Sequence, residues 1–82
     1  MNASYSSLAA YLAHWRALKA GDSLSAKDGA ILAQIDAAIG EILGPDARYL
    51  DEDCADSASR RHRDRAEAKL RRELIARDAI TG

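Results

Sequence analysis

Apolar residues recur at helical spacing in three separate runs of this 82-residue chain, and this pattern constrains the fold more than any other feature. Residues three or four positions apart lie on one face of an α-helix, so each run predicts one apolar helix face. The runs are separated at Gly21 and at Gly44-Pro45, because glycine commonly ends a helix and proline cannot continue one. We therefore predict an all-α, three-helix unit that forms a single small domain over residues 1–82.

The first run predicts a helix over residues 4–20. Ser4 or Ser6 can serve as its N-cap, because a hydroxyl oxygen accepts a hydrogen bond from a free N–H of the first turn. Gly21 is expected to end this helix in a conformation with positive φ, which glycine adopts without strain.

The second run predicts a helix over residues 25–43, with Ser25 as its N-cap. Asp28 lies three residues later, an arrangement similar to the capping box with Asp in place of Glu. Gly40 interrupts the run at a cost of up to about 1 kcal/mol relative to Ala; a close helix crossing would explain it, and simple tolerance is the alternative. Since the connection over residues 21–24 is short, the first two helices are predicted to form an antiparallel hairpin.

The third run follows an acidic connection over residues 45–57. Pro45 can begin a short turn from which Tyr49 and Leu50 anchor the connection in the core. Residues 51–59 then have the composition of a polar loop. The third helix is predicted over residues 58–79, starting near Ser57 or Ser59, and it is long and highly charged. Its apolar stripe is thin and consists of Ala66, Leu70, Leu74 and Ile75, with Ile80 near the end.

Charge is strongly segregated although the whole chain carries a net charge of only −1. Residues 46–56 carry a net charge of −4, and residues 57–82 carry +4. The first turns of the third helix can contact phosphates of a nucleic acid or an acidic partner protein, or they can form a solvated surface. The near-neutral charge of the chain argues against general nucleic-acid affinity. The residues assigned to such contacts are Arg60, Arg61, Arg63 and Arg65.

Residues 59–74, Ser-Arg-Arg-His-Arg-Asp-Arg-Ala-Glu-Ala-Lys-Leu-Arg-Arg-Glu-Leu, resemble the last helix of the promoter-reading region of bacterial sigma factors. The resemblance implies a helix that contacts DNA, and it covers about a fifth of the chain. That family places another helix and a tight turn directly before this one. Here the preceding residues 50–57 are acidic and lack an apolar helix pattern, so the resemblance is not taken as membership of the family.

The first two runs contain more apolar residues than the thin third stripe is expected to cover. Surplus apolar surface on so short a chain favours either self-association or a docked protein partner. Aromatic residues are enriched at the energetic centres of such interfaces. The predicted partner-binding face consists of Tyr5, Leu8, Tyr11, Leu12, Trp15, Ile35, Ile39 and Ile42.

Metal binding and catalysis find little support in the sequence. Cys54, His14 and His62 are too few and too scattered for a structural zinc site, so we expect no metal and no cofactor. The acidic connection fails the calcium-loop pattern, which requires Gly at its sixth and Glu at its twelfth position. Counted from Asp51, those positions hold Asp56 and His62. No catalytic motif is present, so we predict that the chain is not an enzyme.

A single cysteine, the absence of a basic signal segment and the absence of a long apolar run together predict a cytoplasmic protein with no membrane span. The sequence therefore predicts a small, non-catalytic protein-interaction or regulatory module that acts through self-association or docking. The alternative is a nucleic-acid-binding regulator that uses the basic third helix.

Overall fold

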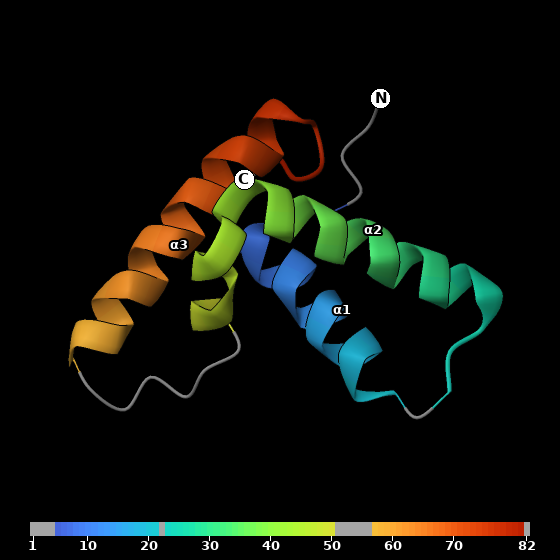
Figure 1. The fold of residues 1–82 in the computed structure, drawn as a ribbon. Coiled ribbons are helices and arrows are strands. Elements are labelled where there is room, and N and C mark those ends of the chain that lie inside the picture. Colours follow the sequence, from blue (N-terminus) through green and yellow to red (C-terminus); the bar gives the residue numbers. More distant parts are fainter. Residues whose placement is uncertain (1–4, 22, 51–56, 82) are drawn as a thin grey trace.

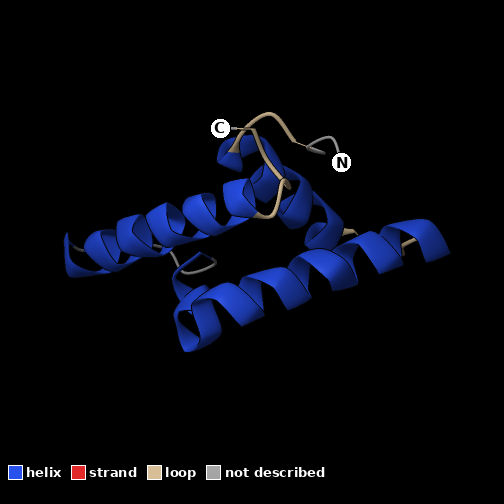
Figure 2. Cartoon of the chain, turned by 90° about the horizontal axis from the view of Figure 1, so that it is seen from above, coloured by secondary structure: helices blue, strands red, loops and turns tan. Residues whose placement is uncertain are grey.

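The structure is a computed structural model that describes residues 5–21, 23–50 and 57–81. Its elements follow the order α1 (Leu8–Ala20), α2 (Ala26–Leu43), a 3₁₀ helix η1 (Gly44–Leu50) and α3 (Ser57–Ala76). The described residues contain no strand, and the all-α, three-helix prediction is confirmed (Figure 2). Figure 1 shows α2 running back past α1 after the connection between them, with α3 alongside η1.

Helix α1 begins at Leu8, which is later than the predicted start at residue 4. Ser7 is the N-cap, and its hydroxyl accepts a hydrogen bond of 3.2 Å from the backbone N–H of Ala10. The prediction of Ser6 as the N-cap is therefore wrong, and Ser4, the other predicted N-cap, lies outside the described residues. The reason is non-local: the backbone of Tyr5 is extended and pairs with the end of the chain, so it cannot join the helix.

The end of α1 also differs from its prediction. Gly21 donates its N–H to the carbonyl of Leu18 at 3.3 Å, but it has a φ of −70° and a ψ of 136°. The expected positive φ is wrong, because the chain leaves the helix in an extended conformation. A Cβ on Gly21 would lie 3.2 Å from Cδ2 of Leu24. Close packing of the connection, and not a positive φ, therefore favours glycine at this position.

Helix α2 follows its local sequence signals closely. Ser25 is the N-cap, and its hydroxyl accepts a hydrogen bond of 3.1 Å from the N–H of Asp28. The helix ends at Gly44, whose φ of 58° is unfavourable for residues with a Cβ. A Cβ on Gly40 would meet nothing within 4 Å, so the close-crossing explanation for this glycine is wrong and simple tolerance remains.

The connection after α2 is more regular than expected. Residues 44–50 form η1, which packs against both α2 and α3. Leu50 is 2% exposed and lies in the core, whereas Tyr49 is half-buried. Arg16 of α1 donates a hydrogen bond of 3.0 Å to the carbonyl of Leu50, which ties η1 to the first helix. Residues 51–56, predicted as a polar loop, lie outside the described residues, and residues 57–59 belong to α3.

Helix α3 ends at Ala76 rather than Ala79, because Asp78 adopts a φ of 61°. The N–H of Asp78 bonds to the carbonyl of Ile75 at 3.0 Å, and the N–H of Ala79 bonds to the carbonyl of Leu74 at 2.8 Å. This pair of bonds is a Schellman motif with Asp at the left-handed position usually held by glycine. The reversal turns the last residues back toward the core.

The two ends of the chain meet beside this reversal. The N–H of Tyr5 bonds to the carbonyl of Ala79 at 3.3 Å, and the N–H of Thr81 bonds to the carbonyl of Tyr5 at 3.1 Å. The hydroxyl of Thr81 also donates to the carbonyl of Ser6 at 3.0 Å. The described segments that precede α1 and follow α3 lie on the same side of the molecule in Figure 2. This pairing buries Ile80, which is 2% exposed.

One hydrophobic core joins all the described elements. Its buried residues come from the three helices, from η1 and from the C-terminal segment. Fully buried aliphatic side chains each stabilise a fold by about 1.5–3 kcal/mol relative to exposure. The thin apolar stripe of α3 is therefore enough to cover α1 and α2, because Leu50 and Ile80 also pack on the core. The core consists of Tyr11, Leu12, Trp15, Leu18, Ile35, Ile39, Ile42, Leu43, Leu50, Ala66, Leu70, Leu74 and Ile80.

Candidate functional site

The predicted partner-binding face is largely interior. Six of its eight residues belong to the chain's own core, and each of them is at most 7% exposed. Tyr5 and Leu8 are half-buried and pack against that core. The expectation that α3 leaves this face uncovered is therefore wrong, because Leu50 of η1 and Ile80 of the C-terminal segment add to the cover that α3 provides. The six buried residues are Tyr11, Leu12, Trp15, Ile35, Ile39 and Ile42.

Trp15 makes two side-chain contacts, one to α2 and one within α1. The Nε1–H of Trp15 donates a hydrogen bond of 2.7 Å to Oδ1 of Asp36 on α2, which satisfies the one polar group of a buried indole. The ammonium group of Lys19 lies 3.8 Å from the centre of the Trp15 ring. Trp15 thus acts as a structural link between α1 and α2 rather than as an exposed contact residue.

Helix α3 separates the four predicted arginines instead of presenting them together. Arg63 is half-buried and forms an ion pair of 3.5 Å with Glu67 on the side of the helix nearer the core. Arg61 and Arg65 are exposed and one turn apart, so they share a face. Arg60 is exposed as well, but the 100° step per residue directs it away from that face.

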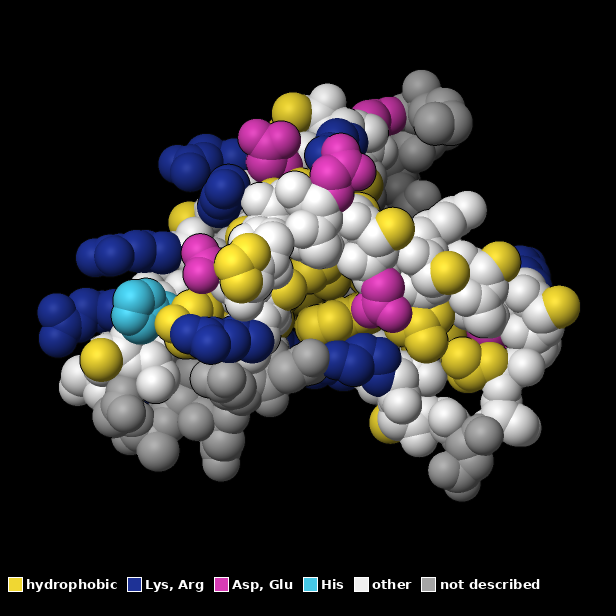
Figure 3. Space-filling model, viewed as in Figure 1, with side chains coloured by type: hydrophobic (Ala, Val, Ile, Leu, Met, Phe, Trp, Pro, Cys, Tyr) yellow, Lys and Arg dark blue, Asp and Glu magenta, His cyan; other side chains and the backbone are white. Residues whose placement is uncertain are grey.

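The face of Arg61 and Arg65 continues into Lys69 and Arg72, two residues that the sequence analysis missed. These four exposed residues stand at positions i, i+4, i+8 and i+11, and we call them the basic stripe. None of the four makes a hydrogen bond or ion pair within the part of the chain that the structure describes. The signal available in the sequence was this helical spacing, which the adjacent Arg-Arg pairs obscured. Figure 3 shows basic side chains projecting from the α3 side of the molecule.

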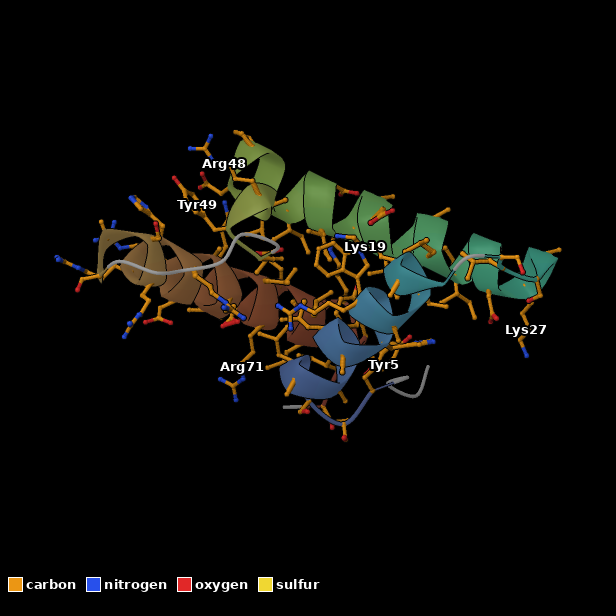
Figure 4. The ribbon with its side chains drawn as sticks, turned by 90° about the horizontal axis from the view of Figure 1, so that it is seen from below. Tyr5, Lys19, Lys27, Arg48, Tyr49 and Arg71 are labelled. Carbon is orange, nitrogen blue, oxygen red and sulfur yellow. The ribbon has the colours of Figure 1, made fainter. Side chains whose placement is uncertain are left out.

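The stripe borders a hollow between η1 and α3. The hollow has a volume of about 340 Å³, and Arg65 and Lys69 line it together with Tyr49 and His62. The rings of Tyr49 and His62 are stacked, with centroids 4.8 Å apart and planes 11° apart. Arg48 donates a hydrogen bond of 3.0 Å to the hydroxyl of Tyr49 (Figure 4). The aromatic pair therefore attaches the first half of α3 to η1.

A larger groove lies on another part of the molecule, between α1, α2 and the paired chain ends. Its volume is about 490 Å³, within the range of small-molecule sites. The hydroxyl of Tyr5 and Nδ1 of His14 share a hydrogen bond of 2.6 Å at this groove. The residues that line it are Tyr5, Tyr11, His14, Ile31, Gln34, Ile35, Ala38, Leu74, Arg77 and Ala79.

Electrostatics distinguish two of the groove residues. Burial raises the pKa of Tyr11, the neighbouring Tyr5 and Asp36 raise it further, and the positive charge of Arg77 lowers it. Burial also raises the pKa of Tyr5. Both phenols are therefore protonated near neutral pH and can donate hydrogen bonds.

Metal-ligating side chains do not cluster in the described ranges. Residues 5–21, 23–50 and 57–81 contain no group of three His, Cys, Asp or Glu side chains placed to hold an ion. His14 and His62 belong to different sites, at the groove and at η1 respectively. Cys54 and the acidic residues 51–56 lie outside the described residues.

No family model, curated protein or solved structure matches this chain. Within the described residues, no helix has both the length and the apolar character that a membrane crossing requires.

Proposed function

We propose that this protein is a non-catalytic interaction module that docks an acidic partner protein through the basic stripe of α3. The observation that carries the proposal is that Arg61, Arg65, Lys69 and Arg72 are exposed and have no ionic partner among the described residues. Opposite charge on a partner steers encounter and fixes the register of a complex.

The spacing of the stripe suggests the shape of the partner. Residues 61 and 72 are separated along the helix axis by roughly 16 Å, at about 1.5 Å of rise per residue. An acidic helix with carboxylates one turn apart presents complementary charge over the same length. Docking is preferred to self-association, because the apolar side chains that suggested self-association are buried within the chain's own core.

The nucleic-acid alternative is less favoured on charge. The chain carries a net charge of −1, and four acidic residues occupy positions 51–56 directly before α3. Carboxylates near a phosphate backbone oppose the counterion-driven attraction on which such binding depends. Nucleic acid is therefore retained as an outcome of the test.

Fluorescence anisotropy with labelled probes tests the proposal. The probes are a helical peptide with glutamates at i, i+4 and i+8, the same peptide with glutamines, and a duplex DNA. We expect the glutamate peptide alone to bind at about 50 mM salt and to weaken by 200 mM salt, as screening predicts. Tighter binding of duplex DNA would favour the nucleic-acid alternative, and no binding of the glutamate peptide would overturn the proposal.

Matched variants show whether the stripe is responsible. Arg61→Ala/Arg65→Ala/Lys69→Ala should weaken peptide binding at least about ten-fold, or about 1.4 kcal/mol. The control Lys27→Ala/Arg60→Ala/Arg71→Ala removes the same charge from exposed positions outside the stripe. Equal losses in both triple variants would show that net charge, not the stripe, determines binding.

A further inference from the structure

The groove between α1, α2 and the chain ends contains a polar group without a partner. Tyr11 is 4% exposed, and its hydroxyl forms no hydrogen bond with any residue that the structure describes. No fully enclosed side-chain oxygen or nitrogen among those residues lacks a hydrogen bond, so this hydroxyl is not sealed in the core. Since Tyr11 lines the groove, its remaining exposure is on the groove side.

The groove has one positively charged lining residue near Tyr11, although the carboxylates of Asp36 and Glu41 act on the same two residues from outside the lining. Arg77 is the one lysine or arginine among the lining residues, and no carboxylate lines the groove. Its guanidinium contacts Glu41 at 3.0 Å, but both side chains are exposed, at 39% and 69%. Exposed ion pairs contribute little stability, so an incoming anion can replace Glu41 at small cost.

The rest of the groove is apolar. Ile31, Ile35 and Leu74 form aliphatic walls, and the rings of Tyr5 and Tyr11 meet edge to face with centroids 5.1 Å apart. Such a surface accepts a branched aliphatic or aromatic body. A protonated phenol and a guanidinium beside it are both hydrogen-bond donors and suit a carboxylate.

We propose that this groove binds a small monocarboxylate with an aromatic or branched aliphatic body, whose carboxylate accepts hydrogen bonds from Tyr11 and Arg77. The apolar body lies between the aliphatic walls of α2 and the end of α3. This site is separate from the basic stripe and goes beyond the docking function proposed above. The same carboxylate chemistry is offered by a free acid and by the C-terminus of a peptide.

Ligand-observed and protein-observed NMR titrations test the site. The probes are phenylacetate, as a free acid, and N-acetylphenylalanine, as a mimic of a peptide C-terminus, each compared with its neutral amide. We expect at least one acid to bind with a Kd of about 1 mM or tighter, to shift groove resonances, and to bind at least about ten-fold more tightly than its amide. The acid that binds more tightly identifies the source.

Variants assign the two donors. Arg77→Gln should weaken acid binding at least about ten-fold and Tyr11→Phe several-fold, while both bind the amide as the wild type does. Glu41→Gln should strengthen acid binding, because it frees Arg77. Tyr49→Phe, which removes a hydroxyl outside the groove, and the stripe variant Arg61→Ala/Arg65→Ala/Lys69→Ala should leave binding unchanged.

Three results would overturn the site: equal affinity for acid and amide, shifts outside the groove, or no acid binding up to about 10 mM. Ala38→Leu fills the groove from a half-buried lining position without changing charge, so it should also abolish binding. Persistent binding in Ala38→Leu would contradict the location. Circular dichroism confirms that each variant is folded. Because the stripe variant is tested separately, failure of the groove and failure of the docking proposal remain distinguishable.

Discussion

Helices α2 and α3 attach to the same core with opposite compositions. Helix α2 buries four residues, Ile35, Ile39, Ile42 and Leu43, and α3 buries three, Ala66, Leu70 and Leu74. Beyond its buried residues, α2 carries further apolar side chains, whereas α3 carries charge almost everywhere else. The comparison shows that a few fully buried side chains suffice to dock a helix, which leaves its remaining faces available for other uses.

The two helices also end differently. Each is followed by a residue with positive φ, 58° at Gly44 and 61° at Asp78. Gly44 has the conformation that glycine tolerates best, whereas Asp78 is held by the Schellman bonds and by the pairing of the chain ends. The local sequence is sufficient to end α2, whereas tertiary contacts contribute to ending α3.

The largest expected effect tests whether α3 is truly docked. Leu70 is 0% exposed, so Leu70→Ala should destabilise the protein by about 2–5 kcal/mol through lost burial and an internal cavity. Ile75→Ala, on the same helix but 42% exposed, should change stability by less than about 0.5 kcal/mol. Urea unfolding followed by circular dichroism measures both, and equal small effects would mean that α3 does not pack on the core.

The next effect compares the two helix ends. Gly44→Ala places a Cβ at positive φ, in a sparsely populated backbone region (φ 58°, ψ −133°), and should cost about 1–3 kcal/mol. Asp78→Gly relieves the backbone restriction at this position and Asp78→Val increases it, so Asp78→Gly should be the more stable of the two variants. Thermal unfolding measures the stability of all three variants. If Asp78→Gly were no more stable than Asp78→Val, the backbone conformation would not limit the reversal.

A smaller gain is expected inside α2. Gly40 is exposed within the helix, and a Cβ there meets nothing within 4 Å. Gly40→Ala should therefore stabilise the protein by about 0.5–1 kcal/mol through helix propensity and reduced unfolded-state entropy. Urea unfolding measures the change. A loss of stability would restore the close-crossing explanation.

The smallest effect is a pH dependence at the groove. Burial raises the pKa of Tyr5 and Tyr11 above 10.0, so folding favours the neutral phenols. Their contribution to stability is complete below the unfolded pKa and is lost as the pH rises through the folded pKa. Phenolate absorbance should therefore appear at higher pH in the native protein than in denaturant, and Tyr11→Phe should remove part of the late-titrating signal. Coincident titrations in both states would contradict this.

The sequence predicted α2 well, because its cap, periodicity and terminating glycine are all local. It misplaced the start of α1 and the end of α3, since Tyr5 and Thr81 pair across almost the entire chain. Periodicity likewise identified the residues of α1 and α2 that need cover, and the sequence placed Leu50 in the core and Ile80 near the end of the third stripe. It did not predict that these two residues complete the cover, because their burial depends on how η1 and the C-terminal segment fold back.

The two candidate sites were also predicted to different extents, because the stripe depends on local helical spacing and the groove depends on tertiary contacts. Arg61 and Arg65 were identified from composition, and helical spacing adds Lys69 and Arg72 once α3 is placed. The groove could not be predicted, because three helices and both chain ends converge to form it. Side chains assigned from sequence to a partner, such as Tyr11, instead divide between the core and that groove.

The central claim is that one copy of the chain completes its own core. Thermal unfolding measured over roughly a hundred-fold range of protein concentration tests it most directly, because a fold that depends on association gains stability with concentration. If the burial of α1 and α2 is internal, the unfolding midpoint stays constant and sedimentation reports a monomer. A midpoint that rises with concentration would contradict the claim and would return the apolar face to a role in self-association.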